Sequence, residues 1–260
     1  MVKVCLVILT LFIGACTADN KKQEASAVYS ETALKDFVMA TADSNKDKSI
    51  TVMDSVLAEA SADSLVFCKT VTFLERPFGN PNSAFKNDDL YAALLQAKMK
   101  SPWIDSITKV KTRERLYLLM QNWPGTIATD FTYETASGFK KKLYDIKGDY
   151  TLLYFYNPEC NACKEMKAAL IASPIITDKV TSGELKILAI YIDKDEKIWL
   201  NHLDDLPQDW IHGRDIDEYL YKNKVYDLRA IPTLYLLDKD KRVVLKDCVE
   251  VREIEKMLAK

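Results

Sequence analysis

The sequence predicts an α/β C-terminal domain, with a central sheet flanked by helices, behind a mostly α-helical N-terminal domain. From residue 150 onward, apolar strand-like runs alternate with helical segments, and a Cys-x-x-Cys pair directly follows the first run. Apolar residues at helical spacing predict the front domain. Because Pro124-Gly125 stops the last helical run, we expect the helical domain at residues 27–122 and the α/β domain at residues 126–260.

The first residues have the features of an export signal. Lys3 precedes an uncharged stretch, Val4 to Ala15, that is too short to span a bilayer but fits the apolar part of a signal peptide. Residues 13–16, Ile-Gly-Ala-Cys, resemble a bacterial lipobox, in which the cysteine is lipidated and becomes the mature N-terminus. A plain signal peptide with an incidental Cys16 is the alternative.

These features predict where the protein works. We expect residues 1–15 to be a removed lipoprotein signal, Cys16 to be lipidated, and residues 16–26 to form a polar tether. The mature chain would be lipid-anchored in the cell envelope and face the periplasm, an oxidising compartment in which disulfides persist. The sequence leaves open whether the anchor lies in the inner or the outer membrane.

Helical segments are expected throughout the front domain. Their predicted ranges are Glu31 to Thr41, Thr51 to Thr72, Asp88 to Lys98 and Thr112 to Asn122. In the last segment Leu116, Leu119 and Met120 recur at helical spacing. Such apolar stripes predict packing between helices and not catalysis.

Oxygen-bearing side chains between Asp43 and Asp54 follow the ligand spacing of an EF-hand calcium loop. Lys48 occupies the position at which glycine permits the sharp turn, and its positive charge opposes a bound cation. The terminal acid, Asp54, is also shorter than the usual glutamate. We therefore favour a polar loop between helices and predict no metal site, although calcium binding stays open.

Strands and helices are expected to alternate along the α/β domain. The expected order is a strand (Tyr150 to Tyr156), a helix (Cys160 to Ala172), a strand (Leu185 to Ile192), a helix (Glu196 to Leu203), an insert (Leu206 to Asp217), a strand headed by Pro232, a hairpin partner (Val243 to Leu245) and a final helix (Glu250 to Leu258). The apolar run Ile187 to Ile190 fits a strand buried on both faces.

Cys160 and Cys163 are the candidate catalytic residues, because two cysteines three apart at a strand-to-helix junction can interconvert between dithiol and disulfide. A zinc site would need a second Cys/His pair at similar spacing. His202 and His212 are ten residues apart with no cysteine nearby. The spacing therefore favours redox chemistry over metal binding.

The position of each cysteine predicts its role. At a helix start, unpaired backbone N–H groups and the positive end of the helix dipole stabilise a thiolate, so Cys160 is the candidate nucleophile. Cys163, one turn later, is the candidate resolving thiol that attacks a mixed disulfide. An inert structural disulfide is the alternative, but a bridge closing so short a loop constrains the unfolded chain little.

The remaining cysteines have separate interpretations. Cys5 leaves with the signal, and Cys16 carries lipid. Cys68 and Cys248 are either buried free thiols, the favoured interpretation, or partners in a disulfide, because connectivity cannot be deduced from sequence.

Together, the Cys-x-x-Cys pair and the segment Ile231-Pro232, at the head of an apolar strand, resemble the thioredoxin fold. The resemblance implies a mixed sheet, a cis Pro232 against the cysteines, and Ile231 as the substrate-facing neighbour. Residues 128–132 and 143–150 further resemble the TlpA/ResA-like branch of membrane-tethered thiol-disulfide oxidoreductases. Four residues depart from the usual pattern: Glu159 replaces a tryptophan, Ala162 a proline, Met166 an acid, and Tyr154 a buried acid.

This resemblance implies an enzyme that exchanges disulfides with client proteins through Cys160 and Cys163, as a reductant, recharged by a membrane electron donor and needing no cofactor. The alternative is a non-catalytic module that binds peptides at Ile231-Pro232, with the helical domain docking partners. The third hypothesis is a peroxidase. The net charge of −2 does not indicate a basic surface for binding nucleic acid. The clients, the redox direction, the oligomeric state and the role of the helical domain stay open.

Overall fold

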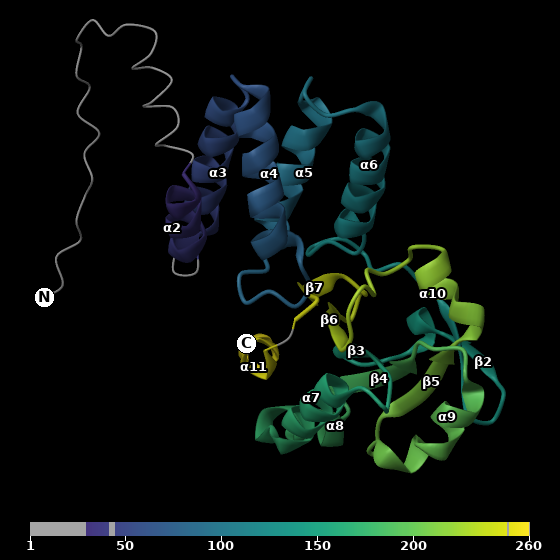
Figure 1. Ribbon diagram of the computed structural model, residues 1–260. Helices are drawn as coiled ribbons and strands as arrows, with labels where there is room; N and C mark the ends of the chain where they lie inside the picture. The colour runs from purple at the N-terminus through teal and green to yellow at the C-terminus, as the bar shows by residue number, and fades with distance from the viewer. Residues whose placement is uncertain (1–29, 42–44, 249, 260) are drawn as a thin grey trace, which may run out of the picture. The chain divides into compact units, whose positions relative to one another are not determined.

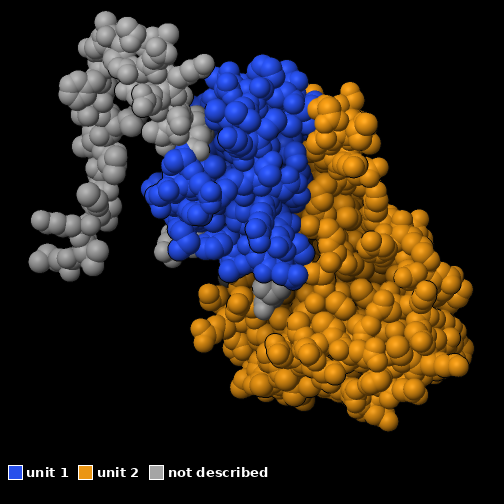
Figure 2. Space-filling model, in the orientation of Figure 1, with its two compact units in different colours: residues 1–104 blue, residues 105–260 orange. Residues whose placement is uncertain are grey.

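The structure is a computed structural model that describes residues 30–41, 45–248 and 250–259. The chain divides into two compact units, residues 1–104 and residues 105–260, which Figure 2 colours blue and orange. The predicted signal, lipidation site and tether, residues 1–26, lie outside the described residues. Among the helices that are described, none combines the length and apolar character needed to cross a bilayer.

The first unit is built from helices. The described ones are α2 (Glu31–Thr41), α3 (Lys46–Ala60), α4 (Ser64–Gly79) and α5 (Asp88–Lys100). Three of them start at a polar side chain that accepts backbone N–H bonds of the first turn: Asn45 for α3, Asp63 for α4 and Asn87 for α5. Such caps satisfy donors that have no partner inside the helix, so the sequence itself marks where each helix begins.

The single helix predicted over Thr51 to Thr72 is wrong. The chain breaks after Ala60, and Asp63 starts a new helix by accepting bonds from the amides of Leu65 and Val66 at 2.8 and 2.9 Å. The cause is local: a short aspartate side chain competes for backbone donors and favours a cap over the helix interior.

The backbone of the candidate calcium loop does not have the shape of an EF-hand loop. Helix α3 begins at Lys46, so most of the segment up to Asp54 is helical and cannot wrap around an ion as an EF-hand loop does. Asn45, one of the candidate ligands, instead caps this helix through the amide of Asp47 at 2.9 Å. Asp43 lies outside the described residues.

The helices of the first unit pack through a buried apolar layer that includes Met53, Leu74 and Leu94. Helices α3, α4 and α5 lie side by side (Figure 1). A partly exposed ion pair joins α4 and α5, since Lys98 Nζ lies 2.7 Å from Glu75 Oε2. This unit is thus a helical body with its own core, as predicted for the front of the chain.

The second unit opens with α6 (Ser106–Met120) and contains a seven-stranded sheet. In chain order the strands are β1 (Thr132–Glu134), β2 (Lys140–Lys142), β3 (Tyr150–Tyr156), β4 (Leu185–Tyr191), β5 (Ile211–Asp215), β6 (Thr233–Asp238) and β7 (Val243–Lys246). Their order across the sheet is β2-β1-β5-β4-β3-β6-β7. The pairs β3/β4 and β4/β5 are parallel, and the other pairs are antiparallel.

Helix α6 joins the second unit, although the sequence places its residues in the helical domain 27–122. Arg115 on this helix lies 2.6 Å from Asp227, and Glu114 lies 3.4 Å from Lys224. The predicted division and the division into compact units therefore differ by one helix.

Both faces of the central strands are buried, because successive side chains of a strand point to opposite faces. On β3, Leu152, Tyr154 and Tyr156 enter one core, and Leu153 and Phe155 enter the other. The first core is completed by α7 (Asn161–Ala172), α8 (Pro174–Ser182) and α11 (Val251–Leu258). The second is completed by the start of the domain and by the segment that contains the short helix α10 (Tyr219–Lys222).

The predicted fold class is confirmed: a mixed sheet flanked by helices follows a helical N-terminal region. Strand β3 has the predicted bounds, and β4 ends one residue earlier than expected. Helix α8, the β1–β2 hairpin and strand β5 were not predicted. Strand β5 lies inside the expected insert, and its Gly213 sits under the ring of Tyr133, where a Cβ would come within 2.5 Å of a ring carbon.

Asp215, the last residue of β5, has a buried carboxyl group of which one oxygen accepts a hydrogen bond. Its side chain is 1% exposed, and Oδ2 accepts the Leu220 amide at 2.9 Å. Oδ1 has no hydrogen-bond partner among the described residues. Burial raises the pKa of this carboxyl from 3.8 to about 6. Folding therefore favours the protonated form, and its contribution to stability is lost as pH rises from about 4 through about 6.

We expect Asp215→Asn to raise the free energy of unfolding by about 2 kcal/mol at about pH 7.5, because the amide keeps an acceptor for Leu220 without a buried charge. Near pH 4 the gain should be a small fraction of that value. Urea unfolding at both pH values measures it. Asp209→Asn, at an exposed position just before β5, is the matched control. An equal gain at both pH values would show that charge burial is not the cause.

Candidate active site

The turn between β3 and α7 positions the first cysteine. Asn157 holds this turn: its side-chain oxygen accepts the Glu159 amide at 2.7 Å, and its backbone oxygen accepts the Cys160 amide at 3.1 Å. Its side-chain nitrogen donates to the Asp193 carboxylate, just after β4. The turn is thereby tied to the end of the neighbouring parallel strand.

Helix α7 begins one residue later than predicted, so Cys160 is its N-cap residue, and this cysteine is half-buried. The Cys163 amide donates to Cys160 Sγ at 3.3 Å, and Cys160 Sγ lies 3.7 Å from the Ile231 carbonyl oxygen. A backbone N–H bond and the start of a helix both favour a negative charge on this sulfur. The geometry therefore supports the role of nucleophile.

Cys163 has a different environment. It is 1% exposed, one helical turn beyond Cys160, and both are free thiols in the structure. Burial, followed by the adjacent Cys160, raises the pKa of the Cys163 thiol to about 12. Cys163 therefore keeps its proton at neutral pH, as suits a thiol that acts only after a mixed disulfide has formed.

The third predicted component lies beside the first cysteine. The Ile231–Pro232 peptide bond is cis, as the resemblance implies, and both residues are partly exposed. The Ile231 carbonyl faces Cys160 Sγ, and the preceding carbonyl, of Ala230, accepts the Thr233 hydroxyl at 2.6 Å. The structure thus brings Cys160 together with Ile231, and Cys163 and Pro232 lie next to them along the chain.

Aromatic side chains of β3 lie beneath the cysteines. The rings of Tyr154 and Tyr156 stack with centroids 5.2 Å apart, and Trp210 meets Tyr154 edge-on at 6.0 Å. The Tyr154 hydroxyl donates to the Cys163 carbonyl oxygen at 2.6 Å. The side chain in place of the usual buried acid is thus a hydrogen-bond donor to the backbone.

A small cavity of about 10 Å³ adjoins Cys163 on the side of α7 and the segment after α9 (Glu196–Asn201). Its lining residues are Tyr154, Tyr156, Asn157, Pro158, Cys163, Lys164, Lys167, His202, Asp205 and Leu206. In the sequence His202 stands out only as a candidate metal ligand, and nothing marks Asp205 or Lys167 as neighbours of a cysteine. No spacing in the sequence marks this grouping, because it depends on how the α9 segment folds back.

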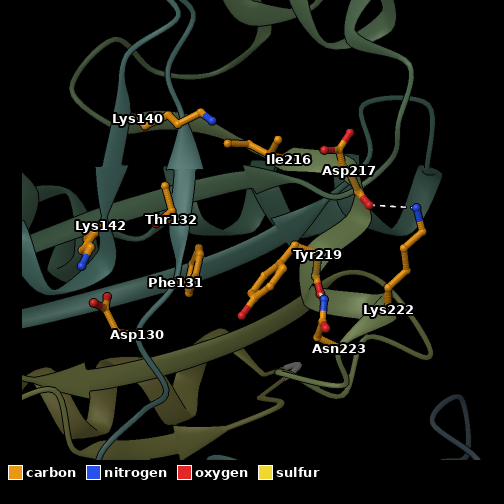
Figure 3. Close-up of a pocket in the computed structure, with 10 residues that line it drawn as sticks. All are labelled: Asp130, Phe131, Thr132, Lys140, Lys142, Ile216, Asp217, Tyr219, Lys222 and Asn223. Atoms are coloured by element: carbon orange, nitrogen blue, oxygen red, sulfur yellow. Dashed lines mark hydrogen bonds between the residues drawn. The ribbon is translucent and has the colours of Figure 1, made fainter.

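A larger pocket, of about 710 Å³, lies between the β1–β2 hairpin and the segment from η3 (Ile216–Glu218) into α10 (Figure 3). Lys140 and Lys142 line its hairpin side, and Tyr219 and Lys222 line the other. The dashed line in Figure 3 marks the bond from Lys222 Nζ to the Asp217 carbonyl at 2.9 Å. Neither cysteine of the Cys-x-x-Cys pair lines this pocket, nor does Ile231 or Pro232.

The other two described cysteines are free thiols: Cys68 is half-buried and Cys248 is buried. Burial raises the pKa of Cys248 to about 12, so it is protonated at neutral pH. In the part of the chain that the structure describes, no three His, Cys, Asp or Glu side chains group as a metal site would require.

Two family models match the sequence. A thioredoxin-like family matches residues 148–243, and a domain of unknown function (DUF5106) matches residues 17–122. A crystal structure of a thioredoxin-like protein from Bacteroides caccae ATCC 43185 is 31% identical, covers 97% of this chain and 99% of its own, and has a TM-score of 0.84. The chain belongs to the thioredoxin-like family. A search of the curated proteins finds no match.

Two further solved structures resemble part of this thioredoxin-like chain. The C-terminal domain of an uncharacterized protein from Bacteroides fragilis NCTC 9343 is 45% identical over 54% of this chain and 99% of its own, with a TM-score of 0.52. A conserved protein of unknown function from Bacteroides fragilis is 36% identical over 52% and 98%, with a TM-score of 0.50. Membership of the TlpA/ResA-like branch stays a prediction.

Proposed function

We propose that the chain is a thiol-disulfide oxidoreductase that reduces disulfides of client proteins in the cell envelope, anchored by acyl chains on Cys16. One observation carries this proposal: the two sulfurs are unequal. Cys160 Sγ is half-buried and accepts a backbone N–H bond, whereas Cys163 is buried and holds its proton. A nucleophile beside a shielded second thiol is the arrangement that two-step disulfide exchange needs.

The proposed exchange has two steps. The Cys160 thiolate attacks one sulfur of a client disulfide, a Cys160–client bond forms, and the other client sulfur leaves as a thiolate. Cys163 then loses its proton and attacks Cys160 Sγ, which releases the second client thiolate and closes the Cys160–Cys163 disulfide. The client gains two electrons and two protons, so a membrane electron donor must later reduce the pair.

Two features support the direction and the kind of substrate. Proteins of this kind are oxidants when their reduced, dithiol form is strongly stabilised. Cys163 is buried and protonated, so it adds no stabilised thiolate to the reduced form. This favours a reductant. The partly exposed Ile231 carbonyl beside Cys160 Sγ offers an acceptor for the backbone of an extended polypeptide. We therefore infer a reductant whose clients present a disulfide on an extended segment.

The proposal is tested by turnover. With dithiothreitol as the electron source, catalytic amounts of the full chain should accelerate the reduction of insulin well beyond the rate with dithiothreitol alone. A variant with both Cys160 and Cys163 replaced by serine is the control. If the native chain gives no acceleration yet binds an unfolded polypeptide as tightly as this double variant does, the chain is a binding module and not an enzyme.

A further inference from the structure

The second step of the proposed exchange needs a proton acceptor beside Cys163. Tyr154 cannot serve, because its hydroxyl already donates to the Cys163 carbonyl at 2.6 Å and burial raises its pKa above the ordinary value. Tyr156, stacked on it, is also held protonated by burial, which raises its pKa. The aromatic side chains beneath the cysteines thus leave the proton without an acceptor on that side.

The cavity of about 10 Å³ offers another route, since Cys163 is one of its lining residues. A space of this size is near the minimum that holds one water molecule. Its charged or titratable side chains, besides the cysteine and the two tyrosines, are Lys164 and Lys167 from α7, and His202 and Asp205 from the segment after α9. The two lysines are donors at neutral pH, which leaves His202 and Asp205 as candidate acceptors.

His202 is prepared for this role by its own hydrogen bond. Its Nδ1 lies 2.8 Å from the Ile198 carbonyl oxygen. A carbonyl oxygen only accepts, so in the neutral ring Nδ1 carries the hydrogen and Nε2 carries the lone pair. The half-buried ring is thereby fixed in the tautomer that can accept a proton at Nε2.

Asp205 occupies a different position. Its residue is exposed, and its backbone carbonyl accepts Lys167 Nζ at 2.9 Å. An exposed carboxylate is well solvated and is screened from a buried thiol. His202, half-buried in the wall of the same cavity, is the better-placed acceptor.

We propose that His202 Nε2 accepts the proton of Cys163, through one water molecule in the cavity, as Cys163 attacks the Cys160–client disulfide. The sulfur–sulfur bond to the client breaks, the Cys160–Cys163 bond forms, and the client sulfur leaves as a thiolate. The imidazolium then releases its proton to solvent. This inference rests on the proposed function and adds a positioning residue for its second step.

Stopped-flow reaction with 5,5′-dithiobis(2-nitrobenzoate) separates the two steps. We would use the full chain with Cys5, Cys16, Cys68 and Cys248 replaced by alanine, so that only the active-site cysteines react. Attack by Cys160 releases the first nitrothiobenzoate, and attack by Cys163 on the mixed disulfide releases the second. A first phase at the native rate also reports that the surroundings of Cys160 are unchanged in each variant.

His202→Gln is expected to slow the second phase by about 10²-fold and to leave the first unchanged, which is the usual scale for loss of a general base. The pH dependence of the second-phase rate should also differ between the two chains, because without the imidazole the variant rate should follow hydroxide alone. His212→Gln, whose ring bonds the Pro207 carbonyl at 2.9 Å, is the matched control and should behave as the native chain does.

The outcomes separate the two proposals. Absence of any second phase in the native chain would overturn the proposed exchange itself. A native second phase that persists unchanged in His202→Gln would overturn only the role of His202, as would slowing by Asp205→Asn alone. If His202→Gln loses the first phase as well, the native pH profile decides, and a native second-phase rate that follows hydroxide alone counts against His202.

Discussion

Replacing Cys160 by serine is expected to lower catalysed insulin reduction to the rate of dithiothreitol alone. The alkoxide form of serine is scarcely populated at neutral pH, and a serine oxygen cannot form the mixed disulfide. Cys163 cannot take over, because it is 1% exposed and burial raises its pKa to about 12. The loss should therefore be complete and not partial.

The matched control for this prediction is Cys68→Ser. Cys68 is also a half-buried free thiol, but it lies on α4 of the first unit and not at a helix start. Insulin turnover by this variant should equal that of the native chain. Persistent turnover in Cys160→Ser would mean that another sulfur is the nucleophile, which would contradict the site described above.

The second large effect concerns the ion cluster that fixes the loop before Pro232. Asp227 is 7% exposed, and its carboxylate lies 2.6 Å from Arg115 Nη2 and 2.9 Å from Arg229 Nε. Although burial opposes ionisation, the two arginines hold the pKa of Asp227 at about 2. We expect Asp227→Asn to lower the free energy of unfolding by about 3 kcal/mol at pH 7, because a buried guanidinium then lacks its counter-charge.

The stabilisation that the same cluster provides should be lost in acid. The pKa of Asp227 is lower in the folded chain than its ordinary 3.8, so its contribution is present above about pH 4 and is lost as pH falls through about 2. Urea unfolding of the native chain and of Asp227→Asn should therefore differ most at neutral pH and converge near pH 2. Asp240→Asn, at an exposed turn, is the control. A difference below about 0.5 kcal/mol at pH 7 would contradict this account.

The parts of the fold that could be predicted from the sequence have local causes. Strand β3 was predicted with its bounds because an apolar run of seven residues, Tyr150–Tyr156, ends at a Pro-containing turn. The start of α7 was predicted to within one residue, because Cys160 follows that turn directly and caps the helix. Ile231-Pro232 was found because a proline heads an apolar strand.

The parts that escaped prediction have tertiary causes. Strand β5 contains His212, Gly213 and Arg214, which are unusual strand residues, and it forms because it pairs with β4 and fits under Tyr133. The grouping of His202 with Cys163 spans about forty positions and arises only when the segment after α9 packs against α7. Neither arrangement leaves a periodic signal in the chain.

In the helical unit, too, some elements could be predicted from the sequence and others could not. Helix α2 has the predicted bounds, whereas the break between α3 and α4 was missed, because a single aspartate cap interrupts an otherwise continuous helical pattern. The lipid anchor at Cys16 lies outside the described residues and stays a prediction. Mass spectrometry of the envelope form would test it.

The most direct test of the central claim, that Cys160 attacks and Cys163 resolves, is covalent trapping. Full chain carrying Cys163→Ser should form a stable mixed disulfide with a disulfide-bonded polypeptide such as insulin, seen as a thiol-sensitive band on a non-reducing gel, with Cys160 identified by mass spectrometry as the linked residue. The Cys160→Ser chain should form no such adduct. Trapping through Cys163 in Cys160→Ser, with none in Cys163→Ser, would reverse the assigned roles and contradict the account.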